Sequence, residues 1–249
     1  MRLIVDRIPA DPAFGLAMEE ALFESIRREG SSLARLWVNR RAIVIGRSQA
    51  VASEVDLAGA EEDGDPVLRR ISGGGTVVHY PGNLNVSVMV ASSSPSLSVA
   101  EAFAQLGGAI ASGLRILGAK VDVRGNRLLG EGRKLGGAAQ ARRGDALLVH
   151  STILVFPARR PIERNLLAHR SEYCPLGVAS RAEPMTNLTE VLGRDVGIEE
   201  VAAAIADGLE RELLQGESMQ PSGVRESEAE RALTLVREKY GSDAWNRSR

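Results

Sequence analysis

The segment from Arg69 to His79 carries the residues best suited to hold an anion. It reads Arg69-Arg70-Ile71-Ser72-Gly73-Gly74-Gly75-Thr76-Val77-Val78-His79. Three consecutive glycines remove the side chains from a turn, so backbone N–H groups can approach an anion while the arginines supply charge. The spacing matches neither G-x-G-x-x-G nor G-x-x-x-x-G-K-[ST], so neither a dinucleotide fold nor a P-loop is implied. On the glycines alone, a plain hairpin turn is an equal alternative.

Lys134 is unusual because the chain otherwise uses arginine as its basic residue. Of 31 basic residues, only Lys120, Lys134 and Lys239 are lysine. Lys120 and Lys239 end helix-like segments, where the helix dipole favours a cation. Lys134 instead lies between Gly132 and the pair Gly136-Gly137, where a compact ammonium can neutralise a carboxylate and a phosphate together. This favours acyl-adenylate chemistry, and an exposed hairpin lysine is the alternative.

Composition and charge bound the class of protein. The chain has 249 residues and a net charge of −1, so no global field draws it to nucleic acid or membrane. No apolar run is long enough to span a bilayer, and Asp6 comes too early for a signal peptide, so we expect a cytoplasmic protein. Cys174 is the single cysteine, which excludes an internal disulfide. The three histidines lack close ligand spacing, so no metal site is predicted.

Hydrophobic periodicity predicts helices interspersed with short strands. The expected helices cover 12–30, 98–118, 198–213 and 226–240, and the expected strands cover 36–38, 42–45, 84–90, 121–123 and 146–156. We expect the first two strands to form a hairpin, the third to be a half-buried antiparallel strand, 56–66 to be a polar loop and 216–225 a linker. The pattern is typical of an α+β fold rather than a parallel Rossmann sheet.

Several blocks, in order, resemble the lipoate-protein ligase A family, whose catalytic domain is the biotin/lipoate A/B protein ligase domain. The segment 69–79 followed by Gly82-Asn83 resembles that family's R-R-x-[ST]-G-G-G-[AT]-V-x-H…G-N signature. Gly132-Arg133-Lys134 with His150-Ser151-Thr152 resembles its G-R-K…H-G-T block. Further matches are Val44–Gln49 with Glu54, and Ser180-Arg181 with Thr186-Asn187-Leu188. The resemblance covers residues 1–195.

The resemblance implies a biotin/lipoate protein ligase-like, class II synthetase-like fold. This is an α+β fold with a mixed, largely antiparallel β-sheet flanked by helices. It also implies a catalytic domain over 1–195. Residues 196–249 would then form a helical C-terminal extension rather than a full accessory domain.

The resemblance further implies a two-step reaction, in which ATP activates lipoate or octanoate to an acyl-adenylate and a lysine of an acceptor domain then takes the acyl group. Lys134 would be the catalytic residue, in contact with both lipoate and ATP. The remaining residues carried over for ATP are Arg70, Gly75, Thr76, Val77 and Val78, and those for lipoate are Gly74 and His79. Trp37 is expected to fill core.

Partners and cofactors follow from the same resemblance. Mg²⁺ would screen the departing pyrophosphate without a dedicated set of protein ligands. The acceptor would be a lipoyl domain of the kind found in 2-oxoacid dehydrogenase E2 subunits or glycine cleavage H proteins. The length of the chain does not decide whether a small accessory protein is needed for full activity.

The main alternative to an ATP-dependent ligase depends on Cys174. Related octanoyltransferases use no ATP and pair a lysine with a cysteine that carries the acyl group as a thioester. Cys174 follows Lys134 as the cysteine does in one such group, whereas the region 121–129, where a second group has it, contains none. Cys174 would then be the nucleophile beside Lys134, unless it is only a small buried hydrophobe. A degenerate relative that binds an acyl domain without chemistry is the non-enzymatic hypothesis.

Overall fold

Eight strands form the main sheet of the computed structural model, which describes residues 1–91 and 97–248. In spatial order the strands are β11 (Gln220–Pro221), β1 (Arg2–Ala10), β2 (Ser32–Asn39), β6 (Asn83–Ala91), β10 (Ala146–Leu154), β9 (Arg133–Arg143), β8 (Arg127–Gly130) and β7 (Val121–Arg124). Strand β1 pairs in parallel with β11 and β2, and the other pairings are antiparallel. The mixed, largely antiparallel sheet predicted from the sequence is confirmed.

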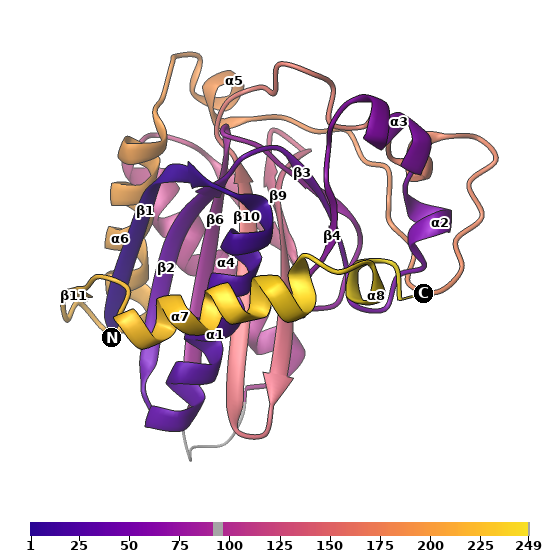
Figure 1. Cartoon of the computed structure of the whole chain (residues 1–249). Helices are drawn as coiled ribbons and strands as arrows, with labels where there is room; N and C mark the ends of the chain where they lie inside the picture. The colour runs from indigo at the N-terminus through magenta and orange to yellow at the C-terminus, as the bar shows by residue number, and fades with distance from the viewer. Residues whose placement is uncertain (92–96, 249) are drawn as a thin grey trace.

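Two helices cover each face of this sheet (Figure 1). Helices α1 (Pro12–Glu29) and α7 (Glu226–Leu235) lie on one face, and α4 (Val99–Ile116) and α6 (Ile198–Leu213) lie on the other. Local signals fix the ends: the Asp11 side chain accepts hydrogen bonds from two backbone N–H groups at the start of α1, and Gly30 ends it with φ 62°. Ser98 and Glu101 form a capping box at the start of α4. All four predicted helices are confirmed, and α7 continues as a π-helical turn, η2 (Val236–Tyr240).

Both faces of the central strands are buried, so alternate residues enter two different cores. On β6, Leu84, Val86 and Val88 pack under α4 and α6, whereas Met89 packs under α1. Ser87 faces α1 as well, since its hydroxyl donates a hydrogen bond to Glu19 of that helix. The prediction of a half-buried strand is therefore wrong, because its polar face is covered by a helix rather than by water.

A second, three-stranded sheet lies beside the first (Figure 1). Its order is β4 (Val67–Arg69), β3 (Ala42–Ile45) and β5 (Val77–His79), with α2 (Val51–Glu54) and α3 (Leu57–Glu62) next to it. The predicted hairpin between β2 and β3 is wrong, because the chain passes from the large sheet to the small one at Arg40-Arg41. The expected polar loop over 56–66 contains α3, which the Asp56 side chain caps.

The remaining segments complete the large sheet and its edges. Residues 125–144 form β8 and β9, and the expected linker over 216–225 contains the short edge strand β11. The last elements are η1 (Leu167–His169), α5 (Leu188–Leu192) and α8 (Asp243–Asn246). The division at residue 195 stays a prediction. In the described part of the chain, every helix is too short or too polar to cross a membrane.

Candidate functional site

Arg69 and Arg70 shape the glycine-rich turn from inside the protein. Arg70 is 4% exposed, and its guanidinium donates to the carbonyls of Val44, Gly73 and Gly75 and to the Ser72 hydroxyl. Burial lowers the pKa of Arg70 to about 10, which leaves it charged at neutral pH. Arg69 is fully buried and donates to backbone carbonyls. The expectation that the arginines supply charge to an anion is therefore wrong for Arg69, whose guanidinium bonds the main chain instead.

A second set of bonds fastens the turn to the loop that carries Ser180. The Thr76 N–H donates to the Ser180 hydroxyl at 2.9 Å, and the Thr76 hydroxyl donates to Gln49 at 3.1 Å. Ser180 in turn donates to the buried carboxylate of Glu54, which also accepts from the Tyr173 hydroxyl at 2.6 Å. Burial together with the hydrogen bond to Glu54 raises the pKa of Tyr173 to about 12, so its proton stays in this bond. The glycine-rich turn and the loop that carries Ser180 therefore form one continuous wall.

Lys134 lies on β9, at a bulge opposite β8. Its backbone N–H donates to the carbonyl of Pro184, and its carbonyl accepts from Thr186, so the segment 184–186 is fixed against β9 at this residue. The side chain folds over Gly137, where an added Cβ would lie 3.4 Å from the lysine Cε. Its Nζ lies 3.5 Å from Glu183, which also accepts from Arg127. Burial alone would raise the pKa of Glu183, but Arg127 and Lys134 outweigh it and hold that pKa below its usual range.

Lys134 borders two cavities. The larger, of about 320 Å³, lies between α1, the glycine-rich turn and the ends of β9 and β10. The smaller, of about 70 Å³, lies between the turn and the loop 162–185. Lys134, Thr76 and Val77 line both cavities. A cation at this junction can contact two ligands at once.

The floor of the larger cavity is polar and buried. His150 Nδ1 lies 2.8 Å from the Glu19 carboxylate, and His150 Nε2 lies 2.7 Å from the Ser72 hydroxyl. Burial alone would raise the pKa of Glu19, but the attraction of His150 and its hydrogen bond hold it low. These bonds join α1, β10 and the glycine-rich turn beneath the place where a ligand would lie.

His79 also lines the larger cavity. Its Nδ1 lies 3.0 Å from the Asn39 side-chain nitrogen, and its ring meets Trp37 edge-on at 5.7 Å between centroids. Burial lowers the pKa of His79 to about 3, which makes the ring neutral at physiological pH. Trp37, expected only to fill core, is 1% exposed but lines the same cavity.

The structure brings together most of the residues chosen from the sequence. Arg70, Gly74, Gly75 and His79 line the larger cavity and Val78 the smaller one, while Lys134, Thr76 and Val77 line both. Cys174 is exposed and lines neither cavity.

Sequence reasoning missed Glu19, Arg127 and Glu183 because each reaches the site from an element that the motifs do not include. For Glu19, the only available signal was an acidic residue among the apolar positions of α1.

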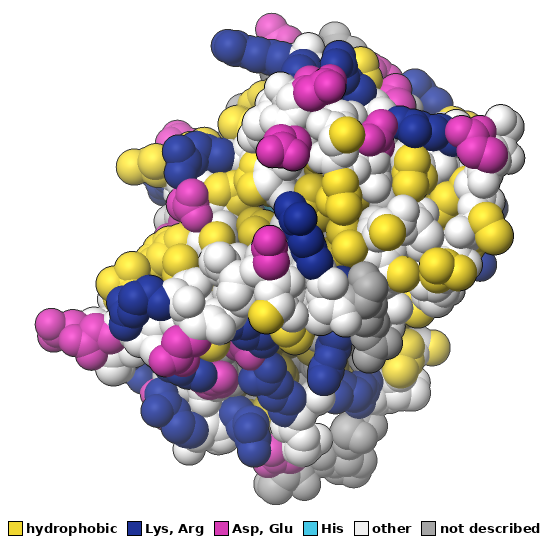
Figure 2. All heavy atoms as spheres, turned by 45° about the vertical axis from the view of Figure 1, so that its right-hand side comes forward, with side chains coloured by type: hydrophobic (Ala, Val, Ile, Leu, Met, Phe, Trp, Pro, Cys, Tyr) yellow, Lys and Arg dark blue, Asp and Glu magenta, His cyan; other side chains and the backbone are white. Residues whose placement is uncertain are grey.

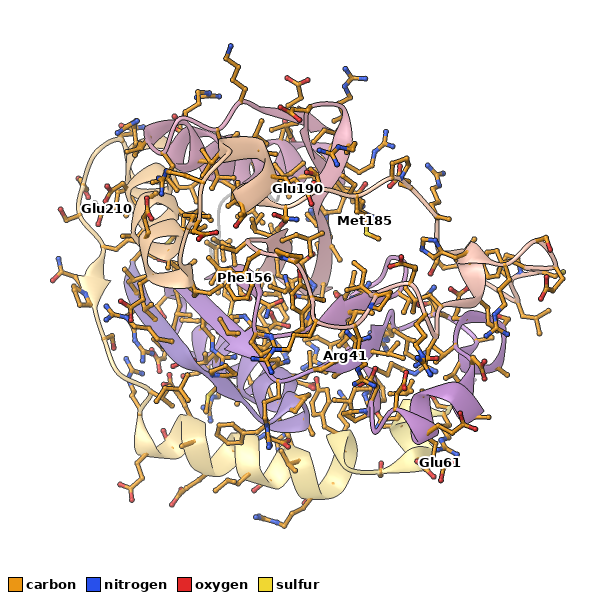
Figure 3. The ribbon with its side chains drawn as sticks, turned by 90° about the horizontal axis from the view of Figure 1, so that it is seen from above. Arg41, Glu61, Phe156, Met185, Glu190 and Glu210 are labelled. Atoms are coloured by element: carbon orange, nitrogen blue, oxygen red, sulfur yellow. The ribbon has the colours of Figure 1, made fainter. Side chains whose placement is uncertain are left out.

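An open groove of about 630 Å³ adjoins the smaller cavity. It is lined by 157–163 and 182–190, and the labelled Met185 and Glu190 lie on the second of these segments (Figure 3). Figure 2 shows one face of the molecule, where hydrophobic side chains gather across the middle and Lys and Arg side chains are most numerous below them.

Among the residues that the structure describes, no group of three His, Cys, Asp or Glu side chains is placed to hold a metal ion.

Comparison with known proteins relates this site to one family. Residues 11–210 match the family model for the lipoyl protein ligase A/B catalytic domain. A lipoate-protein ligase A homologue from Aeropyrum pernix is 32% identical, over 96% of this chain and 89% of its own. The octanoyltransferase LipM of Geobacillus kaustophilus is 30% identical, over 94% of each chain.

Solved structures of related proteins match the fold of this chain over 99% of its length. A lipoate-protein ligase A bound with ATP is 29% identical with a TM-score of 0.84, over 99% of this chain and 98% of its own. A Thermoplasma acidophilum protein with bound lipoic acid is 27% identical with a TM-score of 0.83, at the same coverage. The bipartite lipoate protein ligase of that organism, studied with its E2 lipoyl domain, is 28% identical with a TM-score of 0.86, over 99% of this chain and 95% of its own. The chain therefore belongs to the lipoyl protein ligase A/B catalytic domain family.

Proposed function

We propose that this chain is an ATP-dependent lipoate-protein ligase. Lipoate would occupy the larger cavity and the nucleotide the smaller one and the adjoining groove. The position of Lys134 on the wall common to both cavities carries the proposal. The relatives bound with ATP and with lipoic acid support it.

In the first step, a carboxylate oxygen of lipoate attacks the α-phosphorus of ATP, and the bond from that phosphorus to pyrophosphate breaks. Both reactants are anions, so the Lys134 ammonium lowers the barrier by neutralising their repulsion and holding them in line. The Gly75 backbone N–H would contact the phosphates at the junction of the two cavities, with Arg70 keeping the turn in shape. Mg²⁺ would arrive as part of the Mg–ATP substrate, because phosphate oxygens and water are its usual ligands.

In the second step, the amine of an acceptor lysine attacks the acyl carbonyl carbon, AMP leaves, and the amine loses a proton as the amide forms. We propose a lipoyl domain of the E2 or H-protein type as acceptor, since an E2 lipoyl domain accompanies the Thermoplasma ligase. The bipartite nature of that ligase also supports a second polypeptide as a partner in the adenylation step.

Lipoate-dependent exchange of labelled pyrophosphate into ATP tests the first step. We expect exchange with the wild type and with Lys120→Ala, a matched change of an exposed lysine, and loss of at least a hundredfold with Lys134→Ala. If a second polypeptide is needed for adenylation, the chain alone should still transfer the acyl group from supplied lipoyl-AMP to a lipoyl domain. Failure of both reactions would overturn the proposal.

An acyltransferase that uses Cys174 is the second candidate, favoured by the 30% identity to an octanoyltransferase LipM. Here the cysteine sulfur would attack an acyl-thioester donor and release its thiol, and the acceptor lysine would then attack the new thioester. Mass spectrometry of the chain after incubation with an octanoyl-thioester, without ATP, distinguishes the two. An octanoyl group that forms on Cys174 and is absent in Cys174→Ala would show that the chain is an acyltransferase and not a ligase. Unchanged pyrophosphate exchange in Cys174→Ala would support the ligase.

A further inference from the structure

The segment 240–246 connects the two sheets. Helix α7 crosses the front of the large sheet, and α8 then lies beside β4, the edge strand of the small sheet (Figure 1). The crossing is anchored at Lys239, whose Nζ is 2.7 Å from Glu20 of α1 and 3.9 Å from the centroid of the Trp245 ring. The Tyr240 hydroxyl donates to the same carboxylate at 2.7 Å. Lys239 is therefore an ion-pair anchor, and the sequence interpretation of it as a helix-end cation was incomplete.

Trp245 and Asn246 bond to the edge of β4 as a neighbouring strand would. The Arg69 N–H donates to Asn246 Oδ1 at 3.0 Å, and Trp245 Nε1 donates to the Arg69 carbonyl at 2.8 Å. The Asn246 amide also donates to the carbonyl of Tyr240, which fixes its orientation. The Arg69 guanidinium reaches the same segment, since it donates to the carbonyls of Trp245 and Asn246.

The other side of the Arg69 guanidinium holds the turn 46–49. It donates to the Gly46 carbonyl at 3.0 Å and to the Gln49 carbonyl at 2.7 Å. That turn is in contact with the glycine-rich turn, because a Cβ on Gly46 would lie 2.1 Å from the carbonyl oxygen of Gly74. The Gln49 side chain accepts from the Thr76 hydroxyl and donates to Ser180 at 3.0 Å. Contacts therefore run without a gap from Asn246 to Thr76.

We propose that Trp245 and Asn246 are positioning residues, which act through Arg69 to hold the turns 46–49 and 73–76 in the conformation that binds the nucleotide. A buried guanidinium stays in one place only while its acceptors surround it. When the side chains of Trp245 and Asn246 no longer bond the Arg69 main chain, the segment 245–246 separates from β4 and withdraws its two carbonyls from the Arg69 guanidinium. The guanidinium then shifts, and the carbonyls of Gly46 and Gln49 shift with it. The inference rests on the proposed function for its kinetic readout and on geometry alone for the rest.

Amide hydrogen exchange and steady-state kinetics of the full chain test this with three variants. Asn246→Ala removes the acceptor for the Arg69 N–H, and Trp245→Phe removes only the indole N–H. Asp243→Ala is the control, because this exposed residue of α8 pairs only with Arg247 among the ion pairs of the described chain. In the first two variants we expect amides 46–49 and 72–76 to exchange about tenfold faster, with amides of α4 unchanged. We also expect the KM for ATP to rise about fivefold, with kcat within a factor of two.

Each outcome decides the matter. Wild-type exchange rates at 46–49 and 72–76 in folded Asn246→Ala would overturn the inference, and so would faster exchange in α4 to the same degree, which indicates general destabilisation. Faster local exchange with an unchanged KM for ATP would overturn the nucleotide role. If the wild type exchanges no pyrophosphate, the proposed function fails, and the amide exchange still decides whether the segment 240–246 holds the turns.

Discussion

Replacing Glu183 by Gln should improve substrate binding, because this carboxylate forms an ion pair with Lys134, the cation that the substrates need. Its oxygen lies 3.5 Å from the Lys134 ammonium, and it accepts a further bond from Arg127. Coulomb's law gives an attraction of roughly 1 kcal/mol at that distance in water and about 5 kcal/mol at an effective dielectric constant of 20. The Lys134 and Glu183 side chains are 29% and 20% exposed, so the lower figure governs.

A contribution of about 1 kcal/mol corresponds to about a fivefold change in affinity. We therefore expect Glu183→Gln to lower the KM for lipoate about fivefold in the pyrophosphate exchange assay. The difference from wild type should shrink in 0.5 M salt, because the Debye length there is only about 4 Å. Glu131→Gln is the matched control, since this exposed carboxylate pairs with Arg133 instead of Lys134 and lines neither cavity nor the groove. A KM for lipoate that rises or stays the same in Glu183→Gln would show that Glu183 does not compete with the substrate.

Three further changes probe other parts of the site. Gly46→Ala should raise the KM for ATP at least tenfold, because its Cβ would lie 2.1 Å from the Gly74 carbonyl oxygen; wild-type kinetics would refute the close contact. The pKa of His79 is lowered to about 3 by burial, so the unfolded chain binds more protons than the folded one below pH 6.5. Between pH 7 and 5 the wild type should lose about 2 kcal/mol more unfolding free energy than His79→Gln in urea titrations, and parallel losses would contradict a neutral His79. Glu19→Ala leaves His150 without its buried partner and should cost about 3 kcal/mol in the same titrations, whereas a loss below about 0.5 kcal/mol would mean that the pair is unimportant.

The elements with strong local signals could be predicted from the sequence. The caps at Asp11, Gly30 and Ser98 fixed helix ends because each satisfies backbone groups within its own turn. The glycine-rich turn and Lys134 were found because their residue types are unusual at those positions. These features need no knowledge of what lies across the fold.

The predictions that failed depended on distant partners. Strand β6 alternates polar and apolar residues as an exposed strand would, but Ser87 faces Glu19 because α1 covers that side. The β2–β3 hairpin failed because a short polar connection between strands does not distinguish a hairpin from a passage between two sheets. Glu183 escaped notice because its proximity to Lys134 depends on how the segment 182–187 crosses β9.

The partners of Arg69 and Arg70 have a consequence for sequence variation. Apart from the Ser72 hydroxyl, the hydrogen-bond acceptors of the two guanidinium groups described above are main-chain carbonyls, including those of Val44, Gly46 and Gln49. Every residue type supplies a carbonyl, so a change at Val44 or Arg47 keeps the bond to its arginine. The shape of the glycine-rich turn and of the turn 46–49 is thus separated from the identity of the side chains around them. Side chains at these positions can therefore vary while the two arginines hold the same main-chain path.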